Sequence, residues 1–123
     1  MTGIQNPRFV LHEHISKHPH FDLRFEHERV LKSWAVPKGL PEKSGDRRLA
    51  IAEDDHPIGY IGFEGTLPPG GYGAGDVKIH DTGTYEPLTW GMNGSKLSFT
   101  GRHSLENTFS SGSKKLVTRT GLS

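Results

Sequence analysis

The chain contains no cysteine, which excludes disulfides, thiolate metal sites and cysteine nucleophiles. It also lacks an apolar run of membrane-spanning length and the apolar core of a signal peptide at its N-terminus. We therefore expect a soluble, cytoplasmic protein with no membrane partner. Nor does one sign of charge dominate, since the formal net charge is +1. A polyanion should then bind locally, at an end or a single phosphate, because a protein that coats nucleic acid by charge alone is strongly basic.

Apolar residues are also scarce, at 32% of the 123 residues, whereas glycine and proline contribute 16 and 8 residues. This composition predicts many turns, no long helices and a modest core, which a bound metal could help to stabilise. A chain of this length fits one domain. We expect a single domain over residues 1–123, with residues 1–8 as a loose lead-in.

Residues 20–26 alternate polar and apolar side chains without a break, and a period of two is typical of a half-buried strand. Other short strands are expected at 9–14, 30–36, 48–52, 76–80, 83–85, 96–100 and 115–119. The segments 38–46 and 63–75 carry the residues of loops, and Ser110–Ser113 those of a turn between the last two strands. Many short strands with frequent turns favour a mainly β fold, a small β-barrel or a rolled sheet.

Histidine is abundant, with eight in the chain, and five of them fall within sixteen positions: His12, His14, His18, His20 and His27. The alternation places His20 and Asp22 on one strand face, roughly 6.5–7 Å apart at Cα. His14 can reach the same point if the chain turns near Pro19. Two imidazoles and a carboxylate suit Mn²⁺, Zn²⁺ or Fe²⁺. Three protein ligands leave coordination positions open, as in a catalytic site.

Arg24 continues this face, and a guanidinium beside a divalent metal would clamp a phosphate through two oxygens at once. His56 and Tyr60 form a second candidate group, because an imidazole can donate a proton to a leaving oxygen and a phenol can orient it. Lys38 and Arg48 add positive charge.

These residues also have interpretations that involve no metal or substrate. Alternating polar residues also form the solvent-exposed face of a sheet. Tyr60 is equally compatible with a core ring, and Lys38 and Arg48 are equally compatible with solvated surface charges. His12 and His18 are interpreted as bystanders, although His12 would share a strand face with His14 and could lie behind the ligands.

Six stretches occur together in the chain, in the order FVLHEH (9–14), HFDLRFE (20–26), LKSWAVPKG (31–39), RLA (48–50), DHP (55–57) and FEG (63–65) with the glycine-rich segment to Gly75. In this combination the chain resembles the 3′-phosphoesterase domain of ligase D from bacterial and archaeal non-homologous end joining. The resemblance covers residues 8–90 closely and the rest loosely. Pro19 and the C-terminal part depart from the family pattern.

The resemblance implies a compact β-barrel of about eight strands with short flanking helices. It implies a Mn²⁺-dependent hydrolase, with Co²⁺ or Zn²⁺ as other metals, that acts on nucleic acid 3′ ends at primer-template junctions. A 3′-terminal ribonucleoside would be removed first and the remaining 3′-phosphate second, leaving a 3′-hydroxyl for DNA repair. We expect a stand-alone monomer that works with a separate ligase or polymerase of end joining.

By position, the resemblance makes His14, His20 and Asp22 the metal ligands. It makes Arg24 and His56 phosphate contacts, with His56 a candidate proton donor. The remaining matched positions are Tyr60 as a catalytic residue, Lys38 and Arg48 as phosphate-binding residues, and Glu26 behind the metal ligands. Two rival hypotheses remain: a module that binds DNA ends without chemistry, and a closed structural metal site.

Overall fold

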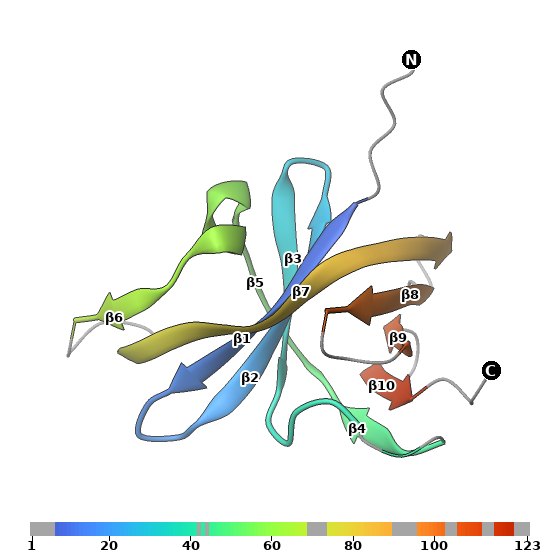
Figure 1. Cartoon of the computed structure of the whole chain (residues 1–123), viewed down its shortest axis with the longest axis horizontal. Coiled ribbons are helices and arrows are strands. Elements are labelled where there is room, and N and C mark those ends of the chain that lie inside the picture. The colour runs from blue at the N-terminus through green and yellow to red at the C-terminus, as the bar shows by residue number, and fades with distance from the viewer. Residues whose placement is uncertain are drawn as a thin grey trace.

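All ten strands in the described part of the chain belong to one antiparallel sheet in the computed structural model, which describes residues 7–41, 43, 45–68, 74–89, 96–102, 106–111 and 115–119 (Figure 1). The strands are β1 (Arg8–Ile15), β2 (His20–His27), β3 (Val30–Val36), β4 (Arg47–Leu49), β5 (Ile51–Pro57), β6 (Gly65–Leu67), β7 (Gly75–Thr89), β8 (Lys96–Gly101), β9 (Asn107–Ser111) and β10 (Lys115–Arg119). A short 3₁₀ helix, η1 (Ile58–Gly62), follows β5.

The sheet is curled, and its two edge strands follow each other in the chain. Its strand order is β4-β10-β9-β8-β7-β1-β2-β3-β5, with β6 beside β7. The end strands β4 and β5 are separated in the chain only by the buried residue Ala50. The prediction of a mainly β fold is confirmed. The sheet is curled rather than a closed barrel, since no ladder joins β4 to β5, and η1 is the helical segment found among the described residues.

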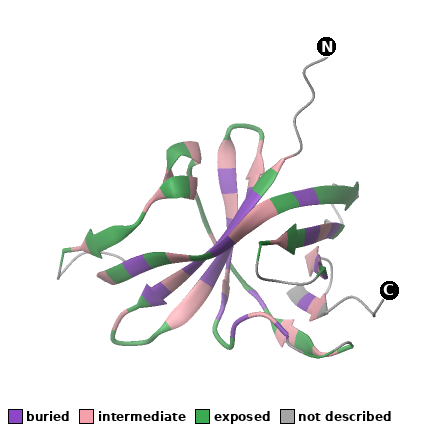
Figure 2. Ribbon diagram, in the orientation of Figure 1, coloured by how far each residue is buried: buried purple, intermediate pink, exposed green. Residues whose placement is uncertain are grey.

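The hydrophobic core occupies the inside of the curl. It is centred on Phe25, whose ring lies 5.1 to 6.4 Å from five other aromatic rings, those of Phe9, Trp34, Tyr85, Phe99 and Phe109. Figure 2 shows the buried residues recurring along the strands. In the middle of β2, however, Asp22 and Arg24 are buried as well as Leu23 and Phe25. Both faces of β2 are therefore covered, one by the core and the other by polar groups.

Several strands differ from the predicted ones. β5 continues through the acidic run to Pro57, β6 lies within the predicted 63–75 loop, and β7 is one long strand instead of two. β9 was not predicted and includes Ser110 and Ser111 of the expected turn, whose remaining residues lie outside the described part, as do 69–73. No helix among the described residues is long and apolar enough to cross a membrane.

Candidate active site

The β1–β2 hairpin brings the predicted metal ligands together. In its register His14 pairs with His20, and His12 pairs with Asp22. Because alternate residues of a strand share a face, all four side chains point to the same side of the sheet. One ligand atom from each of His14, His20 and Asp22 lies within 4.8 Å of the others. We call these three residues the metal triad.

The chemistry of the triad fits a small divalent cation. His20 Nδ1 lies 2.9 Å from the carbonyl oxygen of His18, and a proton on Nδ1 would be donated there. This leaves His20 Nε2 as a ligand atom 3.2 Å from Asp22 Oδ1, an arrangement in which metal-binding histidines are commonly held. Asp22 Oδ1 is buried and accepts no hydrogen bond from the described residues. A cation between these atoms would satisfy an acceptor that is costly to bury alone.

Arg24 connects the triad to the rest of the site. Its side chain is 4% exposed. Nε donates a hydrogen bond to His12 Nδ1 at 3.1 Å, and Nη1 donates one to Ser33 Oγ at 2.9 Å. Nη2 donates to Asp22 Oδ2 at 3.2 Å, while His56 Nδ1 lies 3.1 Å from Nη1. The guanidinium is thus buried, charged and fixed between the metal triad and His56.

His56 at the end of β5 and Tyr60 in η1 meet on the same side of the sheet, with ring centroids 5.0 Å apart. Tyr60 stacks on Phe63 at 4.9 Å and an interplanar angle of 12°, and the Arg24 guanidinium lies 5.0 Å from its ring centroid. Burial, and secondly the charge of Arg24, lower the pKa of His56 below its usual 6.5. The substrate-free imidazole is therefore neutral at pH 7.

The structure places His12 inside the site, where sequence reasoning treated it as a bystander. Its side chain is fully buried, and Nε2 lies 3.1 Å from the carbonyl oxygen of Phe63. Since Nδ1 accepts from Arg24, both contacts are satisfied when the neutral ring carries its proton on Nε2. Burial, followed by the Arg24 charge, lowers the pKa of His12 to about 4. The shared strand face with His14 was the signal for this role.

Glu53 is a pocket residue that sequence reasoning missed. It lies opposite Ser33 in the β3–β5 ladder, and its Oε1 is 3.9 Å from Arg24 Nη1. Burial, and secondly the charge of Asp22, raise the pKa of its carboxyl to about 8. The acidic run before His56 hid it, because strict alternation would place Glu53 and His56 on opposite faces of the strand. A register shift in the β3–β5 ladder between Leu31 and Ser33 brings both of them to the pocket.

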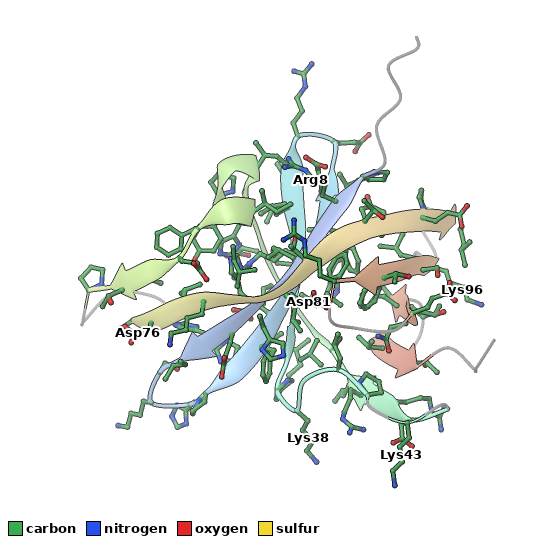
Figure 3. All side chains as sticks on the ribbon, in the orientation of Figure 1. Arg8, Lys38, Lys43, Asp76, Asp81 and Lys96 are labelled. Atoms are coloured by element: carbon green, nitrogen blue, oxygen red, sulfur yellow. The ribbon has the colours of Figure 1, made fainter. Side chains whose placement is uncertain are left out.

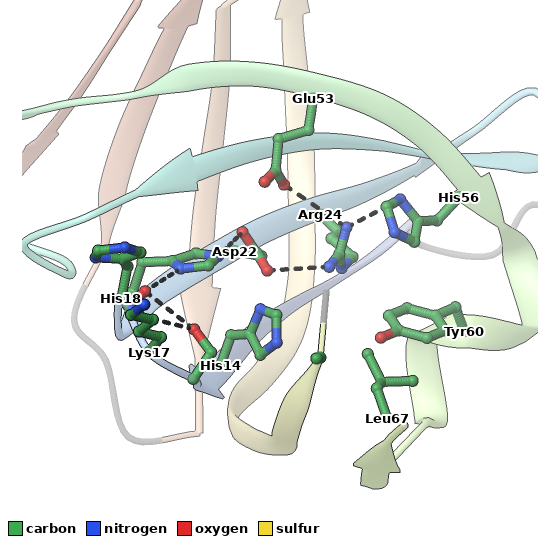
Figure 4. A pocket seen from close by; sticks show the side chains of 12 residues that line it. His14, Lys17, His18, Asp22, Arg24, Glu53, His56, Tyr60 and Leu67 are labelled. Atoms are coloured by element: carbon green, nitrogen blue, oxygen red, sulfur yellow. Dashed lines mark hydrogen bonds and ion pairs between the residues drawn. The ribbon is translucent and has the colours of Figure 1, made fainter. Parts of the chain in front are cut away.

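A pocket of about 570 Å³ is lined by the metal triad, Arg24, Glu53, His56 and Tyr60, whereas His12 does not line it (Figure 4). It is lined by His14, Ser16, Lys17, His18, His20, Asp22, Arg24, Glu53, His56, Tyr60, Leu67 and Ala74. Six predicted residues, the metal triad with Arg24, His56 and Tyr60, are thus brought to one cavity. Their catalytic roles remain predictions.

Three other predicted residues do not line this pocket. Lys38 is exposed in the turn after β3 (Figure 3). Arg48 lies in β4, where its Nη1 donates to the carbonyl oxygen of Arg47 at 3.2 Å. Glu26 lies toward the other end of β2 and accepts hydrogen bonds from Arg8 at 2.7 and 3.2 Å, which lower the pKa of its carboxyl. Any part they play in substrate binding would be outside the pocket itself.

Comparison with known proteins points to one family. A family model described as the DNA Ligase D 3′-phosphoesterase domain matches residues 12–120. The multifunctional non-homologous end joining protein LigD of Mycolicibacterium smegmatis is 52% identical over 85 residues, which cover 69% of this chain and 11% of that protein. The corresponding DNA repair protein LigD of Mycobacterium tuberculosis strain H37Rv is 53% identical over 86 residues, covering 70% of the chain and 11% of that protein.

LigD of Pseudomonas aeruginosa is 46% identical over 81 residues, which cover 66% of the chain and 10% of that protein. The chain thus spans about a tenth of the length of the curated relatives it matches. With a family model matched over most of its residues, the chain belongs to the family of DNA ligase D 3′-phosphoesterase domains.

Proposed function

We propose that this protein is a metal-dependent hydrolase that repairs blocked 3′ ends of DNA or RNA during non-homologous end joining. It removes a 3′-terminal ribonucleoside by phosphodiester hydrolysis and then removes the resulting 3′-phosphate, leaving a 3′-hydroxyl. The observation that carries the proposal is the convergence of the metal triad, Arg24 and His56 on one pocket, in a chain of the 3′-phosphoesterase family.

The proposed cofactor is Mn²⁺, with Co²⁺ or Zn²⁺ as other metals that mixed nitrogen and oxygen ligands accept. His14, His20 and Asp22 would hold it. When bound, the ion would act as a Lewis acid toward a phosphoryl oxygen. Asp22 serves two neighbours at once, because Oδ2 accepts from Arg24 while Oδ1 faces His20.

Arg24 supplies a positive charge that is in place before the substrate arrives. Its hydrogen bonds to His12, Ser33 and Asp22 fix the guanidinium, so no side-chain freedom is lost when a phosphate binds. Burial reduces screening by water, which strengthens the attraction for charge that develops on phosphate oxygens. We assign Arg24 the stabilisation of that charge.

His56 holds a phosphate oxygen and protonates the leaving oxygen in this proposal. Its Nδ1 lies 3.0 Å from the carbonyl oxygen of Asp54, and a proton donated there leaves Nε2 for the substrate. The pKa of the free imidazole is lowered, but a bound phosphate anion favours the protonated form and raises this pKa. Tyr60 orients the same oxygen through its hydroxyl group.

The test is hydrolysis of a primer-template that ends in a 3′-ribonucleotide or a 3′-phosphate, with Mn²⁺ or with EDTA. We expect Mn²⁺-dependent removal of both groups and a loss of at least about 100-fold in His20→Ala. His27→Ala is the matched control, since His27 lies on the same strand but does not line the pocket.

The proposal fails if the wild-type protein releases no more product than His20→Ala. A module that only binds DNA ends would instead retain end affinity in EDTA and in Asp22→Ala, without forming product in either case.

A further inference from the structure

The inference drawn from the shape of the pocket rests on the proposed function. The pocket is larger than the phosphate group that the proposed chemistry needs. Its volume of about 570 Å³ is in the range of sites that enclose whole small molecules. Its lining also changes in character from one side to the other. Figure 4 shows Lys17 and His18 on one side, Tyr60 and Leu67 on the opposite side, and Asp22 and Arg24 between them.

The side of the pocket near η1 and β6 has two apolar lining residues, Leu67 and Ala74, which we call the apolar wall. The β6–β7 ladder, in which Leu67 pairs with Gly75, fixes the backbone of this wall. Tyr60 lies beside this wall, with its ring centroid 4.9 Å from that of Phe63 and 5.0 Å from the Arg24 guanidinium. Leu67 and Ala74 are half-buried. Such a wall favours the uncharged part of a ligand, since it offers apolar area and no charged partner.

The opposite side is formed by the turn of the β1–β2 hairpin, Ser16 to His18, which we call the hairpin turn. Lys17 and His18 are exposed there. Ser16 Oγ accepts a hydrogen bond from the backbone N–H of His18 at 3.3 Å and donates one to its carbonyl oxygen at 3.2 Å, which orders the turn. A lysine ammonium on an ordered turn is a sequence-independent partner for a phosphodiester backbone.

We propose that the substrate strand crosses the pocket in one direction. The 3′-terminal nucleoside contacts the apolar wall, the scissile phosphate lies at the metal triad and Arg24, and the backbone leading to it passes over the hairpin turn. The reverse direction would press a phosphodiester against Leu67 and Ala74, whose side chains carry neither a charge nor a hydrogen-bond donor. Nucleoside removal therefore depends on the apolar wall, whereas removal of a terminal 3′-phosphate does not.

The first test is Leu67→Asn, which keeps the shape of the side chain and removes its apolar character. We expect the KM for ribonucleoside removal to rise about tenfold while the KM for removal of a 3′-phosphate stays unchanged. The matched control is Leu88→Asn, because Leu88 is an exposed leucine of β7 outside the pocket. It should change neither KM.

The second test is Lys17→Ala, which should raise both KM values by the same factor. It should also reduce the slope of log affinity against log salt by about one. A binding measurement in EDTA complements the kinetics. The wild-type protein should bind a primer-template with a complete terminal ribonucleoside more tightly than one ending in an abasic sugar, and Leu67→Asn should remove this difference.

Three results would overturn the proposed direction: equal effects of Leu67→Asn on both reactions, no effect on either, or a Lys17→Ala effect confined to nucleoside removal. Failure of the proposed function is distinguishable, because the wild-type protein would then release neither the nucleoside nor the phosphate.

Discussion

At the scale of single residues, the site is organised around Arg24 as much as around the metal triad. A charge on a side chain that is only 4% exposed is costly unless its donors are paired. Here the guanidinium has three acceptors from three strands: His12 of β1, Asp22 of β2 and Ser33 of β3. Its position is consequently set by the sheet, and the sheet in turn depends on the charge being present.

We therefore predict that Arg24→Lys lowers both stability and activity. A single ammonium group cannot reach His12 Nδ1, Ser33 Oγ and Asp22 Oδ2 together, so buried acceptors lose their donors. The free energy of unfolding should fall by about 2–4 kcal/mol, as measured by urea denaturation, with phosphoesterase activity reduced at least about 100-fold.

Arg8→Lys is the control for this substitution. Arg8 pairs with Glu26 at the surface, with 54% of its side chain exposed, and its replacement should cost less than about 1 kcal/mol. Equal losses of stability in the two variants would contradict a structural role for the buried guanidinium.

At the scale of elements, the β1–β2 hairpin sets the geometry of the triad through its register. A slip of β2 by one residue against β1 would turn His20 and Asp22 to the core face and separate them from His14. The far end of β1 is held by β7, where His14 pairs with Val77 and Ile15 pairs with Asp76. The start of β7 thereby helps to keep the ligands in place.

Gly75→Ala tests this coupling. Gly75 has a φ of +127°, and a Cβ there would lie 2.5 Å from the carbonyl oxygen of Ile15, the neighbour of His14. We expect a loss of about 1–3 kcal/mol in unfolding free energy and weaker Mn²⁺ binding in a titration. Gly59→Ala is the matched control, because a Cβ at Gly59 meets no atom within 4 Å. Similar behaviour of the two variants would show that β7 does not constrain the hairpin.

The elements also show how far sequence can predict this fold. The alternation over 20–26 identified β2 and both of its faces, because a strand that is half polar has a clear period of two. β9 was missed, since Phe109 is the single apolar residue of Asn107–Ser111 and even the polar Asn107 is buried. β6 was missed because pairing with β7 overrides the loop character of its glycine-rich surroundings.

For the site, the triad and Arg24 followed from spacing within β2 and across one hairpin. His12 and Glu53 did not, because their burial comes from distant segments. The carbonyl group that pairs with His12 belongs to Phe63, which lies 51 residues away. Periodicity reports which face a side chain is on, but it does not report what covers that face.

At the scale of the whole molecule, the core and the site lie on opposite faces of the same strands. The aromatic cluster around Phe25 contains no member of the metal triad. We therefore expect the fold to survive metal removal. In EDTA the circular dichroism spectrum should be unchanged, whereas Mn²⁺ at 100 times its Kd should add about 2.7 kcal/mol to the stability. Unfolding on chelation would favour a structural metal site instead.

The pH dependence of stability in EDTA should expose the two opposing titrations beside Arg24. The pKa of His12 is lowered from 6.5 to about 4 in the folded protein. Between pH 4 and 6.5 the unfolded chain therefore binds more protons at His12 than the folded protein does, and stability rises with pH over this range. The pKa of Glu53 is raised from 4.5 to about 8 in the folded protein. Between pH 4.5 and 8 the folded protein therefore binds more protons at Glu53 than the unfolded chain does, and stability falls with pH over this range. Between pH 4.5 and 6.5 the two slopes cancel, and the lowered pKa of His56 adds a rise toward pH 6.5.

Only the Glu53 slope remains above pH 6.5. The metal-free protein should therefore be most stable near pH 6.5 and should lose about 2 kcal/mol of unfolding free energy between pH 6.5 and 8. Urea titrations across this range provide the measurement. Glu53→Gln should abolish the loss, because an amide does not titrate, whereas His12→Gln should leave it intact and flatten the opposing rise below pH 6.5. A wild-type protein equally stable at pH 6.5 and 8 would mean that Glu53 is already ionised beside Asp22, with Arg24 compensating both charges.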